Sequence, residues 1–179
     1  MSGIIWADAA VFGDKGDGMK QLNETQRAML NERRIAAVAT INEEGVPHLT
    51  ALWFLFDGDS FYVMMMSSSV KMKNLRGNRN MALIIESRVA SKEIGVSVSG
   101  EAQILAGDEA LQAIEAIHAK YITGEGLADP DVGPRFREWD DTAVRLTPQR
   151  WIAWDMGAVD QQAFGGKLGS KAYLKPLAV

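Results

Sequence analysis

The stretch from Ile94 to Ile104 alternates between apolar and small or polar residues, and this pattern constrains the fold more than any other feature of the chain. Its apolar positions are Ile94, Val96, Val98, Ala102 and Ile104. Successive side chains of a β-strand point to opposite faces, so the alternation predicts a strand with one face on a core and the other toward solvent. Half-buried strands of this kind are typical of antiparallel sheets.

Five other apolar stretches predict further strands, and turn signals separate several of them. Residues 42–45 (Asn-Glu-Glu-Gly) supply a turn, and the Asp-Gly pair at 57–58 is a strong two-residue hairpin signal. The five stretches are 34–41, 48–56, 61–66, 81–86, and a last strand through 144–147 that resumes at 151–154. We therefore expect about six antiparallel strands.

Three or four helices are expected beside these strands. Asn23 is a residue type favoured at helix N-caps, and Gln26 stands at the third helical position, so a short helix should begin after Asn23 and run to about Arg33. The other expected helices are 70–77, 108–121 and a short piece around 136–139, with a loop at 124–133. Together these elements predict one mainly β, α+β domain at 23–157, between an N-terminal extension (1–22) and a C-terminal tail (158–179).

The composition excludes several kinds of chemistry. The chain has 179 residues, 47% of them apolar, which suffices for one domain with its own core. It has no cysteine, which excludes disulfides, thiolate metal sites and a cysteine nucleophile. Only two histidines occur, His48 and His118, so a His-rich metal site is not expected.

Charge and hydropathy bear on partners and location. The net charge of −4 argues against a general nucleic-acid binder, which usually shows a basic face. The first residues lack the pattern of a secretory signal, and the apolar run from Ala51 to Phe56 is far too short to span a bilayer. We therefore expect a cytoplasmic protein that binds neither nucleic acid nor membrane.

Residues 67–74, Ser-Ser-Ser-Val-Lys-Met-Lys-Asn, are the strongest candidate for a binding site. A helix that begins after the serines would present hydroxyls, free backbone N–H groups and the positive end of its dipole. Lys71 and Lys73 add full charges, and Arg76 follows one turn later. This combination can hold a phosphate, although the same residues also suit an ordinary N-cap followed by a solvated basic helix face.

Aromatic residues and methionines are a second candidate feature. Trp53 and Phe54 lie in one predicted strand, and Trp151 and Trp154 lie in the last. They could form the apolar walls of a site for a flat ring, or they could fill a core or a dimer interface. Alternation places Met64 and Met66 on one side of their strand and Met65 on the other.

The segments RIAAVATINEEGVPHLTALWF, FYVMMMSSSVKMKNLRGN, VSVSGEAQIL and RLTPQRWIAWD occur in this order along the chain. In this order they resemble the pyridoxamine 5'-phosphate oxidase-like superfamily, also called the flavin/deazaflavin oxidoreductases. The resemblance covers most of residues 24–155. It implies a six-stranded antiparallel split β-barrel with flanking helices, usually a homodimer with a cofactor site at each side of the interface.

The resemblance also implies which residues hold the cofactor, FMN or the deazaflavin F420. Ser68, Ser69 and Lys71 match the usual phosphate contacts. Lys73 and Asn74 are weaker matches for the same role, and the directly preceding Met66 and Ser67 complete this part of the predicted site. Residues expected along the ring are Thr50, Ala51, Leu52 and Trp53. The aromatic residue matching Trp154 often comes from the second subunit, where it and the N-terminal arm would line the substrate side.

Two departures from the family pattern argue against oxidation of vitamin B6. The tail AFGGKLGSKAYLKPLAV lacks the arginine-rich motif that binds the substrate phosphate in the true pyridoxamine-phosphate oxidases. Val70 stands where those enzymes often have arginine. The segment RWIAWD is more similar to the subgroup that includes F420-dependent reductases, but the sequence does not decide between FMN and F420.

We therefore expect an oxidoreductase that transfers hydride between a bound flavin or deazaflavin and a small organic substrate. No residue is expected to act as a catalytic acid or nucleophile, since two scattered histidines give no Ser–His–Asp arrangement. The alternatives are a non-catalytic flavin, F420 or haem carrier of the same fold, and a structural dimer that has lost its ligand.

Overall fold

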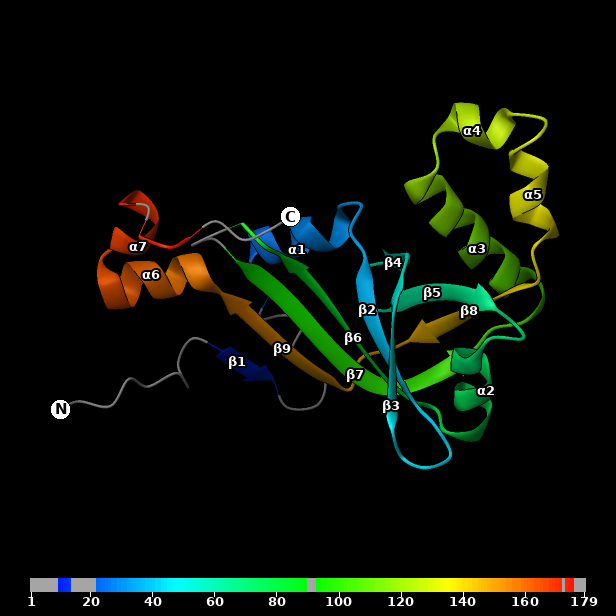
Figure 1. Cartoon of the computed structure of the whole chain (residues 1–179), viewed down its shortest axis with the longest axis horizontal. Coiled ribbons are helices and arrows are strands. Elements are labelled where there is room, and N and C mark those ends of the chain that lie inside the picture. The colour runs from blue at the N-terminus through cyan, green and yellow to red at the C-terminus, as the bar shows by residue number, and fades with distance from the viewer. Residues whose placement is uncertain (1–9, 14–21, 90–92, 172, 176–179) are drawn as a thin grey trace.

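The computed structural model describes residues 10–13, 22–89, 93–171 and 173–175 (Figure 1). Most of the expected N-terminal extension lies outside these residues. The strands are β1 (Ala10–Gly13), β2 (Ala36–Ile41), β3 (Pro47–Leu52), β4 (Phe54–Phe56), β5 (Phe61–Met66), β6 (Asn80–Ser87), β7 (Ile94–Ile104), β8 (Asp141–Leu146) and β9 (Arg150–Asp155). The helices are α1 (Glu24–Asn31), α2 (Val70–Gly77), α3 (Gly107–Tyr121), α4 (Gly124–Ala128), α5 (Gly133–Glu138), α6 (Met156–Phe164) and α7 (Lys167–Ser170).

The strands form one antiparallel sheet that curls back on itself. Its main order is β3-β2-β6-β7-β8-β5-β4, with β9 paired to β7 and β1 paired to β9. The two ends of this order, β3 and β4, are consecutive in the chain and are separated only by Trp53. A sheet whose first and last strands meet at one residue is a half-open barrel, so the split-barrel fold with flanking helices is confirmed.

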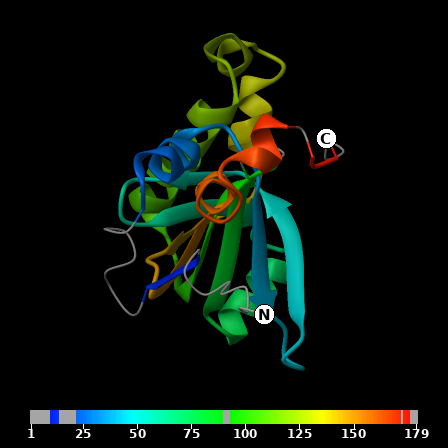
Figure 2. The same ribbon diagram turned by 90° about the vertical axis from the view of Figure 1, so that its left-hand side faces the viewer.

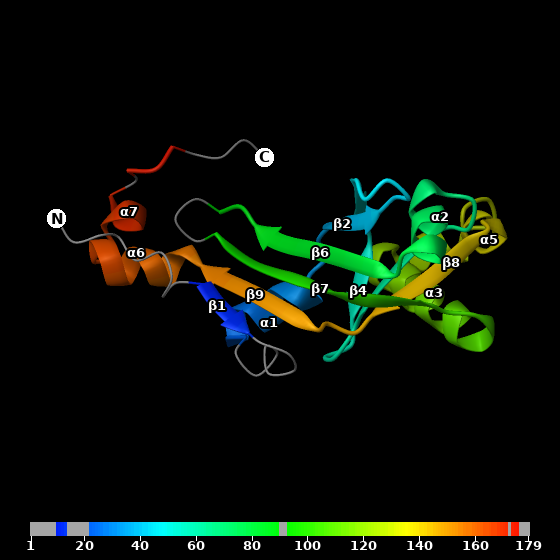
Figure 3. The ribbon, with the colours of Figure 1, turned by 90° about the horizontal axis from the view of Figure 1, so that it is seen from below.

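Strand β7 holds the two halves of the barrel together. Its first part pairs with β6 and β9, and Ala102, Gln103 and Ile104 pair with β8. The expected alternation is present, because Val96 and Val98 are buried while Ser97 and Ser99 are partly exposed. Eleven residues in one strand thus serve both halves, as Figure 3 shows from below.

The described residues form nine strands rather than the expected six. The stretch 48–56 divides at Trp53, because β3 pairs with β2 whereas β4 pairs with β5. The last predicted strand also divides into β8 and β9, which pair with different parts of β7. The ninth strand, β1, comes from the region expected to be an extension, and its backbone pairs with β9.

Helix α1 forms where the sequence predicts a cap, and helices α4 and α6 form where no helix was expected. Asn23 and Gln26 make the full capping box of α1. The loop expected at 124–133 contains α4, whose N-cap Thr123 accepts from the N–H of Gly126. The tail contains α6, where Asp155 accepts from the N–H of Ala158 at 3.1 Å. None of the helices in the described part of the chain is long and apolar enough to cross a membrane.

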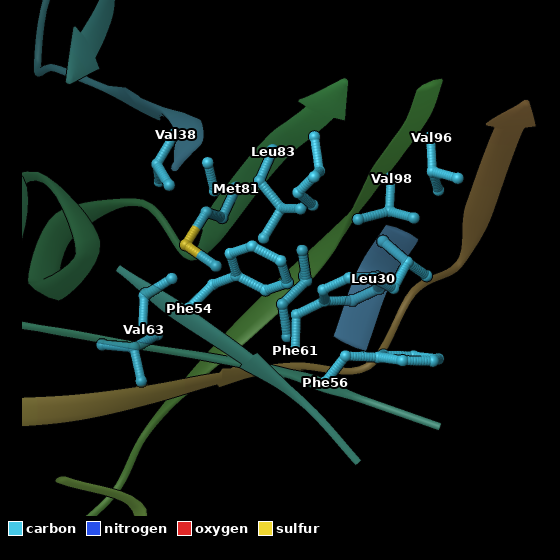
Figure 4. Close-up of a cluster of buried hydrophobic side chains, with 14 of the residues drawn as sticks. Leu30, Val38, Phe54, Phe56, Phe61, Val63, Met81, Leu83, Val96 and Val98 are labelled. Carbon is cyan, nitrogen blue, oxygen red and sulfur yellow. The ribbon is translucent and has the colours of Figure 1, made fainter. Parts of the chain in front are cut away.

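The core lies inside the curl of the sheet, under α1 (Figure 4). Phe54, Phe56 and Phe61 bring three rings together there, with 4.7 Å between the ring centroids of Phe56 and Phe61. Leu30 of α1 and Met72 of α2 are both fully buried in the same cluster. Burial of these side chains fixes both short helices to the barrel, since each contributes about 1.5–3 kcal/mol of transfer free energy.

The remaining helices lie at opposite ends of the molecule. Helices α3, α4 and α5 cover the end where β5 and β8 run, and α6 with α7 projects beyond the end of β9 (Figures 1 and 2). The outward-facing residues of β2, β6 and β7 lie between these ends and are half-buried in the described part of the chain. We call this surface the outer sheet face; it consists of Ala37, Ala39, Ala82, Ile84, Ser97 and Ser99.

Candidate functional site

The first turn of α2 carries unpaired backbone donors. Ser69 is the N-cap, and its hydroxyl accepts from the N–H of Met72 at 3.4 Å. Among the described residues, no recorded hydrogen bond uses the backbone N–H of Ser68, Val70 or Lys71. Free N–H groups at the positive end of a helix dipole form a site suited to an anion.

Ser67 is engaged elsewhere. Its backbone N–H donates to the carbonyl of Asp140 at 2.8 Å, and its hydroxyl donates to the Asp140 carboxylate. These bonds fix the start of the serine turn to the segment between α5 and β8. Ser67 therefore positions the turn, while Ser68 and Ser69 are the hydroxyls that remain near the helix start. No local pattern indicates this pairing, because Asp140 lies 73 residues away.

The two lysines differ in their surroundings. Lys71 is partly buried in the first turn of α2, with no ion pair recorded among the described residues. Lys73 forms an exposed ion pair with Glu43, with 3.2 Å between Nζ and Oε1. Lys73 already has Glu43 as a partner and is exposed, whereas Lys71 is partly buried beside the free N–H groups, so Lys71 is the stronger candidate for a bound anion.

Asn74 and Met66 lie on either side of the same turn. Asn74 is buried, and its amide donates to the hydroxyl of Thr40 on β2 at 3.0 Å. This bond fixes α2 to the sheet, which is a positioning role beside the predicted contact with a cofactor. Met66 is 55% exposed at the end of β5, whereas Met65 is buried, so the expected alternation is confirmed.

Strand β3, the predicted ring strand, borders the opening of the barrel. Thr50 and Leu52 are half-buried on its inner side, and Ala51 is exposed on the outer side. The hydroxyl oxygen of Thr50 is buried and has no hydrogen-bond partner. A buried hydroxyl without a partner costs free energy unless something else bonds to it, so Thr50 fits a position beside a bound ligand.

Trp53 is held in place by a cluster that sequence reasoning missed. Its ring stacks in parallel on Tyr121 of α3, with 4.9 Å between the centroids. The Tyr121 hydroxyl donates to the carbonyl of Arg34 and accepts from the N–H of Phe54 at 3.3 Å. Burial raises the pKa of Tyr121, so this hydroxyl stays protonated and can keep donating.

Lys120 lies next to the same cluster. Its ammonium is 3.9 Å from the centroid of the Phe54 ring and donates to the carbonyl of Leu30 at 3.2 Å. Burial lowers its pKa from 10.5 to about 8. Amines with a lowered pKa occur near functional sites, and structural clusters also shift pKa values, so the lowered pKa alone assigns Lys120 no role.

Trp154 lies far from the α2 turn within one chain. Its indole covers Gly95 of β7, where an added Cβ would come within 1.8 Å of the ring. Position 95 pairs with Trp154, and position 104 pairs with β8 at the other end of the same strand. The strand between them covers roughly 30 Å at about 3.3 Å per residue. Figures 1 and 3 show the end of β9 well away from α2, so a single chain does not bring Trp154 and Lys71 into one site.

The buried titratable pair His118 and Asp141 lies outside the predicted site. Burial lowers the pKa of His118, which nearby carboxylates partly oppose, and burial raises the pKa of Asp141. His118 packs on Phe136, and its Nε2 has no recorded partner. The described residues contain no cluster of three or more acidic or histidine side chains that could hold a metal ion.

The curled antiparallel sheet and its flanking helices define a split-barrel protein of the α+β class. Residues 22–155 match the family of pyridoxamine 5'-phosphate oxidase, and the chain belongs to this family. No curated protein matches the chain in sequence.

Several solved structures share the fold. A conserved hypothetical protein, Rv2991 from Mycobacterium tuberculosis, is 26% identical, with a TM-score of 0.60 over 88% of this chain and 92% of that one. The heme storage protein HutZ from Vibrio cholerae is 16% identical, with a TM-score of 0.57 over 72% and 91%. An F420 reductase is 18% identical, with a TM-score of 0.54 over 73% and 98%. These likenesses establish the fold but not a common activity.

Proposed function

We propose that the chain is an oxidoreductase that binds FMN or F420 and transfers hydride between this cofactor and a small organic substrate. Membership of the pyridoxamine 5'-phosphate oxidase family supports the cofactor class. The observation that carries the proposal is the set of unpaired donors at the start of α2, beside Lys71. Their chemistry fits the phosphate that both cofactors carry.

The residues of this chain would bind and orient the cofactor, which supplies the hydride chemistry. Ser68, Ser69 and Lys71 would hold the phosphate, with Lys73 contributing less because of Glu43. Thr50 would donate its unpaired hydroxyl, and Trp53 would form a wall whose plane is set by the stacked ring of Tyr121. No residue is assigned as a general acid or base.

A homodimer is part of the proposal. The outer sheet face consists largely of alanine and serine, and such small side chains let another chain approach closely. The resemblance to the family also implies that the aromatic residue matching Trp154 reaches the cofactor from the second copy. Replacing Ala82 with arginine should give monomers by light scattering and weaken cofactor binding, whereas Ala119→Arg on the exposed side of α3 should change neither. A dimer that persists with Ala82→Arg would contradict this arrangement.

The test of the phosphate site compares FMN with riboflavin, which lacks the phosphate. Charge-assisted hydrogen bonds contribute about 1.5–3 kcal/mol, so Lys71→Ala should weaken FMN binding by about tenfold or more. The same variant should leave riboflavin binding unchanged. Lys73→Ala should have a smaller effect because Glu43 already pairs with that lysine. If Lys71→Ala binds FMN as tightly as the wild type, the proposed phosphate site is wrong.

A haem or flavin carrier is the second candidate. Solved structures of the same fold include a heme storage protein and the flavocytochrome Anf3 from Azotobacter vinelandii. His48 is partly exposed on β3 and lies opposite Thr40, which bonds to Asn74 of α2, so an imidazole is available near the candidate site. Saturable haem absorbance that disappears in His48→Ala, without turnover of bound flavin, would favour the carrier.

A further inference from the structure

A cleft of about 720 Å³ opens at the end of the outer sheet face near the start of β2. Its walls come from the loop between α1 and β2 and from the end of β6, which are more than 50 residues apart in the chain. The apolar part of its lining is Ile35, Ala37, Ala51, Ile84 and Val89. Ala37 and Ile84 belong to the outer sheet face, on which we propose a second copy. Ile35 and Val89 lie outside that face and are 52% and 58% exposed in the single chain, so they can still present apolar side chains to a ligand of small-molecule size.

Three guanidinium groups border this apolar floor, and two of them are already paired. Arg34 binds Glu32, with 2.8 Å from Nε to Oε2, and its Nη1 donates to the carbonyl of Glu86 at 3.0 Å. Arg88 binds the Glu86 carboxylate through Nε at 2.7 Å and through an ion pair. Arg33 is exposed and has no ion pair or hydrogen bond among the described residues.

The side chains around the cleft therefore carry one more positive charge than negative charges. Arg33, Arg34 and Arg88 face two carboxylates, those of Glu32 and Glu86, which gives a net charge of +1. A guanidinium offers a fork of donors that matches a carboxylate, sulfonate or phosphate in two-point contact. The free fork of Arg33 lies at the border of an apolar surface, which suits a ligand with an apolar body and one anionic group.

The cleft also adjoins the predicted ring strand. Ala51, one of the predicted ring residues, lines it from the outer side of β3, whereas the side chain of Thr50 lies on the inner side of the same strand. The backbone of Arg34 is bonded to Tyr121, the residue stacked on Trp53. A ligand in the cleft would thus lie against the same strand that we propose to support the cofactor ring.

We propose that this cleft is the substrate site, and that it selects a small, apolar organic acid through Arg33. The identity of the ligand as a substrate rests on the proposed function, whereas the binding of an anion does not. Reduced FMN or F420, bound as proposed above, would supply a hydride to the substrate and would itself be left oxidised. The substrate would take one proton from water to complete the two-electron reduction.

Binding is tested first, on the full chain without added cofactor. Isothermal titration compares naphthoate with its uncharged amide, which has nearly the same shape. Naphthoate should bind more tightly, and Arg33→Gln should weaken it by about tenfold while leaving the amide unchanged, because a charge-assisted bond is lost. The advantage of naphthoate should shrink as salt is raised.

Two further variants test the charge argument in opposite directions. Glu86→Gln removes the carboxylate that pairs with Arg88, so it should tighten naphthoate binding several-fold. Arg137→Gln, at an exposed position on α5, removes the same charge as Arg33→Gln and should change nothing. Equal binding of acid and amide, or equal loss in Arg33→Gln and Arg137→Gln, would overturn the proposal.

An assay of quinone turnover then distinguishes the proposed substrate site from the proposed oxidoreductase function. The protein is loaded with chemically pre-reduced FMN or reduced F420 and is given naphthoquinone or its sulfonate derivative. Arg33→Gln should lower kcat/KM about tenfold for the sulfonate and leave the uncharged quinone unchanged. Anion binding without any turnover would contradict the oxidoreductase function and would still support the anion site. Turnover of both quinones with no effect of Arg33→Gln would keep the function and overturn this site.

Discussion

Replacing Tyr121 with phenylalanine should destabilise the protein through two hydrogen bonds alone. The change keeps the ring that stacks on Trp53 but removes the hydroxyl that donates to the carbonyl of Arg34 and accepts from the N–H of Phe54. Each such bond contributes about 1 kcal/mol net, so we expect a loss of about 2 kcal/mol. For a chain of this size that corresponds to a Tm lower by roughly 4–8 °C.

Thermal and urea unfolding would measure this loss, with tryptophan fluorescence as a second readout. Tyr121→Leu also removes the stacking on Trp53 and should cost about 1 kcal/mol more. Cofactor affinity should fall further in Tyr121→Leu than in Tyr121→Phe, because only the former frees the Trp53 ring. A Tm for Tyr121→Phe within about 1 °C of the wild type would refute the view that this hydroxyl holds the kink between β3 and β4.

Three further perturbations test other parts of the structure. Gly95→Ala places a Cβ within 1.8 Å of the Trp154 indole, so the ring must move, and both the fluorescence of the protein and its Tm should change; an unchanged spectrum would contradict the packing. The pKa of Lys120 is about 8 in the folded state, below its ordinary 10.5, so between these pH values the folded state binds fewer protons than the unfolded state. The free energy of unfolding should therefore rise with pH across this window, and Lys120→Met should abolish the rise in pH-dependent unfolding. Asn74→Ala leaves the buried hydroxyl of Thr40 without its partner and should cost about 1–3 kcal/mol in urea unfolding, and this cost should largely disappear in a Thr40→Val background.

The sequence predicted the parts of the fold that depend on local patterns. The alternation in β7 correctly predicted which face of the strand is buried, because apolar and polar residues alternate along Val96, Ser97 and Val98 with the period of a strand. The capping box at Asn23 and the start of α2 after the serines were also correct. These features depend on residues within a few positions of one another.

The sequence did not predict the features that depend on distant contacts. The division of one long predicted strand at Trp53 depends on Tyr121, 67 residues beyond Phe54, whose hydroxyl bonds to the backbone there. The helix α6 was missed because its mixed composition gives no clear periodicity, although Asp155 provides a cap. Strand β1 was read as an arm, since its pairing with β9 leaves no local trace.

In the candidate site too, the sequence predicted local features and missed distant contacts. The serine turn and Lys71 were identified from residues adjacent in sequence, and the structure places them at the start of one helix. The Asp140 contact that occupies Ser67 and the Glu43 contact that offsets Lys73 come from remote segments. The arginine cleft joins the residues after α1 to the end of β6, so no local motif could indicate it.

Cofactor binding is the central claim, and a direct titration tests it. The purified protein would be titrated separately with FMN and with F420 while absorption and fluorescence are followed. We expect saturable binding of one of the two, weakened by Lys71→Ala. Saturation with neither cofactor would rule out the proposed oxidoreductase and would leave a haem carrier as the better-supported function of this chain.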